Sequence, residues 1–199
     1  MLVRPPNFPS TLFIKTTVAV SVLLLPALSL NAQLTRQDWL RADEQTVRLK
    51  PSAFPTLPSA VRMELEHRGC TIPQPSGASQ RRNAVSGSFI TAGQTDWAVL
   101  CSRDKRSAIL IFRAASSDHV DELAEEPDLR YLQVISRDNK IGYSRMLTAL
   151  NPQSLQSRAI KRSALKTIDH DGIEDAFIDK GSLIWHWSGV KWVKVSGGE

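Results

Sequence analysis

The chain has 199 residues, a formal net charge of +5 and two cysteines. This length suits a single domain that buries a core of its own. The positive charge is too small to indicate a nucleic-acid partner. Composition therefore excludes a strongly basic binding protein and leaves other classes of function open.

The N-terminus has the pattern of a secretory signal peptide. Arg4 and Lys15 are its only charges, and an almost wholly apolar run covers residues 17–30. That run has the length of a signal h-region and is shorter than the roughly 20 residues that span a bilayer. We predict cleavage after Ala32, with Ser29 as the alternative site; an uncleaved anchor is the other interpretation. Cleavage takes the net charge to +3 and leaves a periplasmic or secreted protein with no transmembrane segment in the mature chain.

The two cysteines, Cys70 and Cys101, both follow this segment. An even cysteine count in an exported chain predicts one disulfide bond between them, with a pair of free buried thiols as the alternative. The chain has no C-x-x-C motif, so we expect the bond to be structural rather than catalytic.

We divide the chain into a signal peptide over 1–32, an N-terminal arm or linker over 33–55 and a domain over 56–199. Residues 36–49 allow a short helix, but apolar positions there are sparse. The domain is predicted to be a compact α+β fold with antiparallel β-hairpins and one or two helices.

The clearest predicted helix covers residues 59–68. Leu57, Val61 and Leu65 recur every four residues and define one buried face, and Gly69 suits a left-handed cap at its end. An exposed loop over 71–82, rich in Pro, Ser, Gly and Gln, follows this helix.

Several later segments have the patterns of strands. Residues 96–102 and 108–113 predict an antiparallel hairpin. A short acidic helix is predicted over 118–126 because its acids fall in the early turns. A strand is predicted over 131–135, whereas 144–150 is ambiguous between strand and helical turn. The end of the chain predicts a hairpin that turns at Ser188 and Gly189.

A loop near the C-terminus has the spacing of a calcium site. Calcium takes six to eight oxygen ligands, and here acids alternate before Gly172. The predicted ligands are Thr167, Asp169, Asp171, the carbonyl of Ile173, and Asp175. Thr167 stands where an acid is usual, which lowers the expected affinity. The other interpretation, which we favour, is an Asp- and Gly-rich turn without metal; no other cofactor is predicted.

This loop and a second one resemble the repeat loops of FG-GAP and VCBS-type domains. The second loop, over 87–99, keeps Gly87, Phe89, Gly93, Asp96, Ala98 and Val99 but lacks the other acids. The resemblance implies a strand–turn–strand device used twice. We do not expect a closed propeller, which needs four to eight blades.

The chain is also similar to uncharacterised exported bacterial proteins. The similar segments are Cys70-Thr71-Ile72-Pro73-Gln74, residues 93–101 with the pattern G-Q-x-D-W-A-V-L-C, and residues 170–175 with the pattern H-D-G-I-x-D. This resemblance covers most of the mature chain and implies no function.

No catalytic residue is predicted. The chain has no H-E-x-x-H, G-x-S-x-G or P-loop motif. His170 among its neighbouring acids is a candidate acid–base group, although a solvated loop histidine is the favoured interpretation. An aromatic strip of Trp185, Trp187 and Trp192 suits either a glycan or peptide site or, as we favour, the core of a sheet.

These patterns predict an exported binding or envelope-associated protein that is not an enzyme. Its expected partner is an envelope component, a glycan or a protein, and not nucleic acid. A basic segment over 158–166 suits an anionic envelope surface, with a solvated face as the simpler interpretation. A hydrolase that acts near the loop from Asp169 to Asp175 is the alternative function.

Overall fold

A computed structural model describes residues 33–136, 139–159 and 168–198. The chain divides into two units, Met1–Gln33 and Leu34–Glu199. The predicted signal peptide lies outside the described residues. Within them the chain forms three α-helices and twelve antiparallel strands. The domain is therefore mostly β and has one helix more than predicted.

The first sheet is a four-stranded meander. It holds β3 (Ala84–Gly87), β4 (Asp96–Arg103), β5 (Arg106–Phe112) and β6 (Val120–Pro127), in that order. The predicted hairpin is confirmed as β4 and β5, with Val99 opposite Leu110 and Leu100 opposite Ile109. Both faces of this hairpin are buried, which explains why its sequence is a continuous apolar run and does not alternate with polar residues.

The prediction of an acidic helix over 118–126 is wrong. These residues form β6, which pairs with β5 through partners such as Val120 with Phe112 and Leu123 with Ile109. A register shift near Ala124, whose φ is +53°, gives the strand its irregular path. Pairing with the buried strand β5 outweighs the weak helical preference of the acids.

The second sheet is also a meander, with β9 (Arg145–Leu150), β10 (Gly172–Phe177), β11 (Gly181–Trp187) and β12 (Trp192–Ser196). The ambiguous segment over 144–150 is therefore a strand. The terminal hairpin is confirmed, and its turn is closed by the Ser188 N–H, which donates to the Lys191 carbonyl at 3.0 Å.

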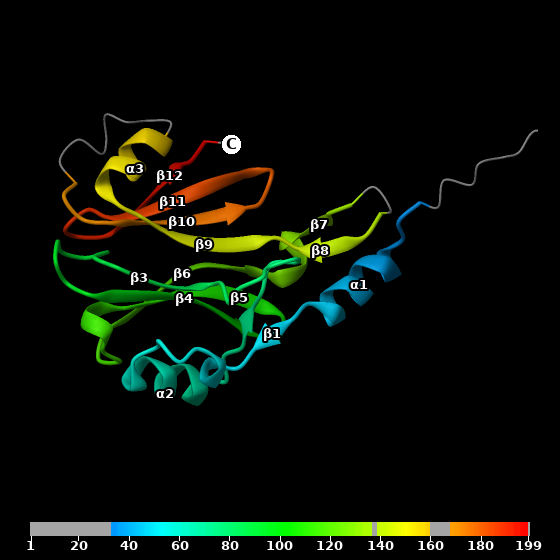
Figure 1. The fold of residues 1–199 in the computed structure, drawn as a ribbon, viewed down its shortest axis with the longest axis horizontal. Coiled ribbons are helices and arrows are strands. Elements are labelled where there is room, and N and C mark those ends of the chain that lie inside the picture. Colours follow the sequence, from blue (N-terminus) through cyan, green and yellow to red (C-terminus); the bar gives the residue numbers. More distant parts are fainter. Residues whose placement is uncertain (1–32, 137–138, 160–167, 199) are drawn as a thin grey trace, which may run out of the picture. The chain divides into compact units, whose positions relative to one another are not determined.

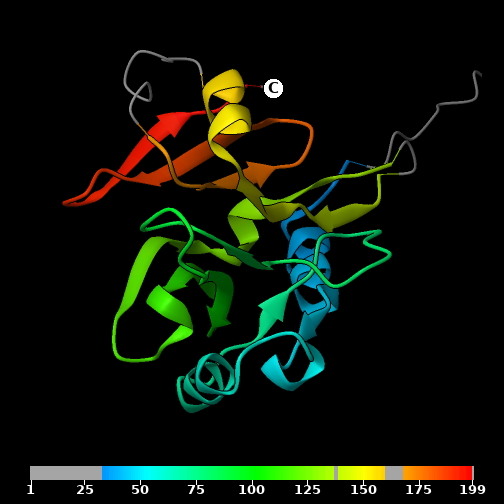
Figure 2. The same cartoon turned by 60° about the vertical axis from the view of Figure 1, so that its left-hand side comes forward.

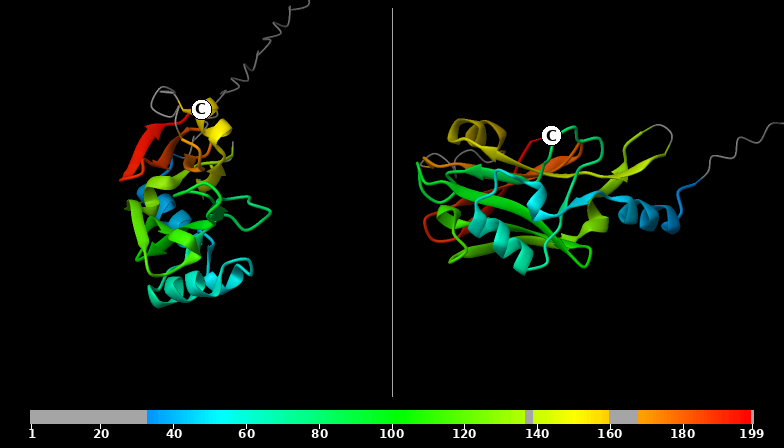
Figure 3. Two further views of the ribbon diagram at one scale, coloured as in Figure 1. Left: turned by 90° about the vertical axis from the view of Figure 1, so that its left-hand side faces the viewer. Right: turned by 60° about the horizontal axis from the view of Figure 1, so that its bottom comes forward.

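The two meanders pack face to face between two helices, α2 (Ser59–His67) and α3 (Pro152–Arg158). Figures 1 and 2 show this order of layers, and Figure 3 shows it from two further directions. The core between the sheets contains Ala98, Leu100, Ile109, Ile111, Leu147 and Ile173. The other face of the first sheet packs against Val61 and Leu65 of α2, and Leu155 of α3 packs on the second sheet.

The predicted helix near residue 59 is confirmed as α2. Gly69 ends it with a φ of +69°, and the Cys70 N–H donates to the Leu65 carbonyl at 2.9 Å. The predicted disulfide between Cys70 and Cys101 is present, so it joins the end of α2 to β4. Within the described part of the chain, no helix is long and apolar enough to cross a membrane.

The segment over 33–55, predicted as an arm or linker, contains α1 (Arg36–Gln45), β1 (Arg48–Leu49) and the 3-10 helix η1 (Pro51–Ala53). Thr35 and Asp38 form a capping box at the start of α1. Arg48 donates to the buried carboxylates of Asp43 and Asp128. These contacts attach the segment to the domain.

Two small ribbons complete the fold. Strand β1 pairs with β2 (Ile72–Pro73), and β7 (Leu132–Val134) pairs with β8 (Ile141–Tyr143). The strand predicted over 131–135 is therefore confirmed as β7. Two further 3-10 helices, η2 (Arg113–Ala115) and η3 (Asp128–Tyr131), flank β6.

Candidate functional site

The two loops that resemble each other in sequence contact each other in the structure. The Asp171 N–H donates to the Ser88 carbonyl at 2.8 Å, and the Ser88 N–H donates to the Asp171 carboxylate at 2.9 Å. A side chain at Gly87 would lie within 3 Å of that carboxylate. These reciprocal bonds join one end of the first sheet to the second, so the glycine and the acid have a structural role.

Asp96, the first residue of β4, also has a structural role, because it holds the loop that precedes this strand. It is fully buried, and its carboxylate accepts the N–H groups of Ile90 and Ala114 at 2.9 and 2.8 Å. Gln94 also donates to it at 2.6 Å. The carboxylate therefore accepts hydrogen bonds from backbone N–H groups that lie outside the strands, where the chain turns.

The predicted calcium ligands have separate surroundings. Asp175 lies within β10 and forms a buried ion pair with Arg145 at 2.8 Å. Ile173 belongs to the core between the sheets, whereas Asp169 is exposed. Thr167 lies outside the described residues. Among the residues that the structure describes, no three His, Cys, Asp or Glu side chains are grouped so that they could hold a metal ion.

We expect millimolar calcium to leave the melting temperature unchanged. The carboxylates of Asp171 and Asp175 already have protein partners, and a ligand stabilises a fold only when it binds the folded state. Thermal unfolding with calcium, and with chelator as the control, measures this. A rise in melting temperature that the Asp169→Asn variant abolishes would establish the calcium site instead.

The terminal tryptophans face the first sheet. Trp185 and Trp192 pack against the core between the sheets, and the Trp192 indole donates to Asp121 of β6 at 3.1 Å. The guanidinium of Arg113 lies 4.4 Å from the ring centre of Trp187. The strip thus serves packing between the two sheets, which agrees with the favoured interpretation.

The basic segment over 158–166 is described only at its start. Arg158 is bound to the buried Glu174 at 2.7 Å across the outer face of the second sheet. Its other basic residues, Lys161, Arg162 and Lys166, lie outside the described residues.

A cleft of about 490 Å³ lies where the acidic loop meets the β11–β12 turn. His170 and His186 both line it, together with Thr91 and Asp169. The His170 Nδ1 lies 3.1 Å from the Asp171 carbonyl. His186 is only 4% exposed, and neither of its ring nitrogens has a hydrogen-bond partner among the described residues.

This environment makes His186 a source of pH-dependent stability. Burial lowers its pKa, His170 lowers it further, and the nearby Trp187 backbone acts in the opposite sense. At pH values between the lowered pKa of the folded state and the unfolded value of about 6.5, His186 therefore binds a proton in the unfolded chain but not in the folded chain. The stabilisation is fully present above the unfolded value and is lost as the pH falls towards the lower pKa of the folded state.

We expect unfolding free energy to fall between pH 7 and 5 by at most about 1.4 kcal/mol per pH unit from this residue. Urea unfolding across this range should show a shallower pH dependence for His186→Leu. The exposed His119 offers a matched control, because His119→Gln should keep the wild-type dependence. Equal pH dependence in His186→Leu and wild type would contradict the prediction.

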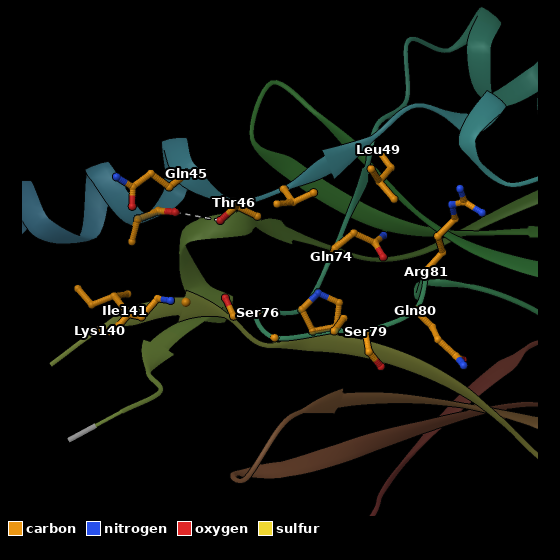
Figure 4. Close-up of a pocket in the computed structure, with 16 residues that line it drawn as sticks. Gln45, Thr46, Leu49, Gln74, Ser76, Ser79, Gln80, Arg81, Lys140 and Ile141 are labelled. Carbon is orange, nitrogen blue, oxygen red and sulfur yellow. Dashed lines mark hydrogen bonds between the residues drawn. The ribbon is translucent and has the colours of Figure 1, made fainter. Parts of the chain in front are cut away.

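A larger groove of about 760 Å³ lies beside α1, β1 and β8 (Figure 4). One wall contains Gln45, the last residue of α1, and the next two residues, Thr46 and Val47. Leu49 of β1 and Ile141 of β8 also line the groove. Val47 is 58% exposed, which is high for a large apolar side chain. The lining residues include no carboxylate, imidazole or thiol.

A loop over 74–82, which is fixed at both ends, also lines the groove. The Gln74 side chain accepts the Arg82 N–H at 2.7 Å and donates to the Arg82 carbonyl at 2.9 Å. Asn83 donates to the carbonyls of Pro73 and Arg145. Residues 76–82 between these anchors are exposed. The loop is therefore a surface feature on a rigid base, which is a common arrangement for binding.

The exposed loop predicted over 71–82 is exposed only over 76–82, because Ile72 and Pro73 form β2 and residues 72–75 are buried. The sequence did not indicate the role of this loop. Its polar composition and the pair Arg81-Arg82 were the available signals, and neither shows that the loop faces α1 and β8. No family model matches the chain, and no curated protein or solved structure matches it either.

Proposed function

We propose that this chain is an exported, non-catalytic binding domain whose ligand occupies the groove beside α1 and β8. One observation carries the proposal: a groove of about 760 Å³ combines exposed apolar surface at Val47 with hydrogen-bonding side chains. Ligand sites typically combine apolar walls with a few polar groups. The disulfide and the predicted signal peptide support export.

Titration with the fluorescent apolar probe 1-anilinonaphthalene-8-sulfonate tests this proposal. We expect saturable binding to one site, weakened about tenfold by Val47→Asn because an apolar contact is lost. Met63→Asn is the matched control, since Met63 is equally exposed, at 61%, but lies on α2 outside the groove. Unchanged probe binding in Val47→Asn would overturn the proposal.

A hydrolase that acts near the acidic loop is the second candidate. The cleft that brings Asp169 and His170 next to His186 favours it, because imidazoles are the commonest general acid–base groups. Hydrolysis of p-nitrophenyl acetate, with His186→Leu as the inactive variant and His119→Gln as the active control, tests this candidate. Equal rates in the two variants would remove it.

A further inference from the structure

We infer that the groove binds an acidic peptide in an extended conformation, which adds as a strand to the free edge of β8. This inference rests on the proposed function and specifies its ligand. Three observations support it: the direction of the backbone groups in β8, the charges on the rim, and the apolar side chains beside that edge.

The hydrogen bonds of the β7–β8 ribbon show which edge is free. The Ile135 N–H donates to the Lys140 carbonyl and the Ser144 N–H to the Tyr131 carbonyl, both at 2.8 Å. Bonded and non-bonded pairs alternate in an antiparallel ladder. The backbone groups of Ile141 and Tyr143 therefore point away from β7.

This outward edge is already paired at one end. The Tyr143 carbonyl accepts the Ser76 N–H at 2.7 Å, so one residue of the loop of the groove is bonded to this edge of β8. The backbone N–H and carbonyl of Ile141, two residues earlier, have no partner among the described residues, and Ile141 lines the groove. An unpaired strand edge is a template for another chain.

The charged side chains on the groove have one sign. Arg81 and Lys140 are exposed, and they are the only charged residues in its lining. Neither side chain forms an ion pair within the described residues. A ligand with carboxylates would pair with both cations, whereas a basic ligand would be repelled.

The spacing of the wall residues suits a strand. Side chains of an extended peptide alternate between two faces, so one set can contact Val47 and Ile141 while the other reaches Arg81 and Lys140. An anionic lipid would satisfy the charges but would leave the Ile141 backbone groups unpaired. The free edge therefore favours a peptide.

Fluorescence anisotropy with synthetic peptides tests this inference on the purified chain. The probe is a fluorescein-labelled octapeptide that alternates Glu and Val. We expect it to bind at least about tenfold more tightly than the Lys–Val octapeptide, and than a Glu–Val octapeptide N-methylated at alternate residues on the edge that would face β8. Equal binding of the N-methylated peptide would overturn strand addition. Equal binding of the Lys–Val peptide, or binding to phosphatidylglycerol vesicles without peptide binding, would overturn an acidic peptide as the ligand.

Variants of the chain locate the bound peptide. Lys140→Glu should weaken Glu–Val binding about tenfold, whereas Lys191→Glu, an exposed lysine outside the groove, should not. Ile141→Pro removes the outward N–H together with the apolar side chain, so Ile141→Ala, which loses the side chain alone, is its control. The proline variant should bind the peptide more weakly than the alanine variant, whereas the two variants should bind the apolar probe alike. Equal effects of the two lysine reversals would overturn the site.

The two proposals fail in different ways. If the apolar probe binds in a Val47-dependent manner and no peptide binds, the peptide inference fails and the groove remains a ligand site. If probe binding does not depend on Val47, the proposed function itself fails.

Discussion

Replacing Arg145 by Met should lower the free energy of unfolding by about 3–5 kcal/mol, because it leaves a buried charge without its partner. Arg145 is fully buried in the core and is the largest fully buried side chain in the described part of the domain. Its guanidinium donates to both carboxylate oxygens of Asp175, to the carbonyl and hydroxyl oxygens of Ser107, and to the Ala124 carbonyl. All five N–H donors are therefore satisfied.

These partners come from both sheets, which is why the effect should be large. Asp175 belongs to β10, whereas Ser107 and Ala124 belong to β5 and β6. Burial is the largest influence on the pKa of Arg145 and lowers it, but the hydrogen bonds and charge of Asp175, together with smaller effects of Tyr131 and Tyr143, outweigh burial and raise the pKa, so the side chain is charged when folded. The Tyr131 ring, 4.3 Å from the guanidinium, covers it.

Urea unfolding measures this prediction, and Arg158→Met is the matched control. Arg158 pairs with the buried Glu174 of β10, but the Arg158 side chain is 55% exposed and Ser182 also donates to Glu174 at 2.9 Å. Water and Ser182 can therefore still solvate that carboxylate, and the loss of Arg158 should cost less, about 1–2 kcal/mol. The double variant Arg145→Met with Asp175→Leu should recover most of the loss, because it leaves no unpaired charge. Similar costs for Arg145→Met and Arg158→Met would contradict the prediction.

Removing the disulfide should cost about 3–4 kcal/mol. Cys70 and Cys101 are 31 residues apart, and closing a loop of this length restricts the unfolded chain by about that amount in the chain-entropy model. Both residues also lie in the core that α2 forms with the first sheet. The Cys70→Ala, Cys101→Ala double variant should therefore shift the urea midpoint downwards.

Reducing agent provides the control for the disulfide. Dithiothreitol should lower the urea midpoint of the wild-type chain towards that of the double variant and leave the variant unchanged, because the sequence contains no other cysteine. Two alkylatable thiols in the native protein, or a midpoint that dithiothreitol does not move, would contradict the prediction.

Local patterns in the sequence predicted the elements whose residues decide their own structure. The four-residue repeat of Val61 and Leu65 predicted α2, the apolar runs predicted β4 and β5, and the alternating tryptophans predicted the terminal hairpin. Gly69 predicted the end of α2 because few other residues adopt its backbone conformation. The cysteine count predicted the disulfide.

Contacts between distant segments explain what the sequence did not reveal. The acids of β6 resemble the start of a helix because the sequence does not show that this segment pairs with β5. Asp171 and Asp175 resembled calcium ligands because their spacing does not disclose partners at Ser88 and Arg145. The groove was also not predicted, since it forms only where α1, the loop over 74–82 and β8 meet.

The reciprocal bonds between Asp171 and Ser88 have a consequence for the order of folding. They join residues 83 positions apart, whereas the disulfide spans 31, and distant contacts form more slowly than local ones. Early in folding, the face of β4 and β5 that the second meander covers is therefore still exposed. We expect the covalent bond to hold α2 and the first meander together until the second meander arrives and shields that face.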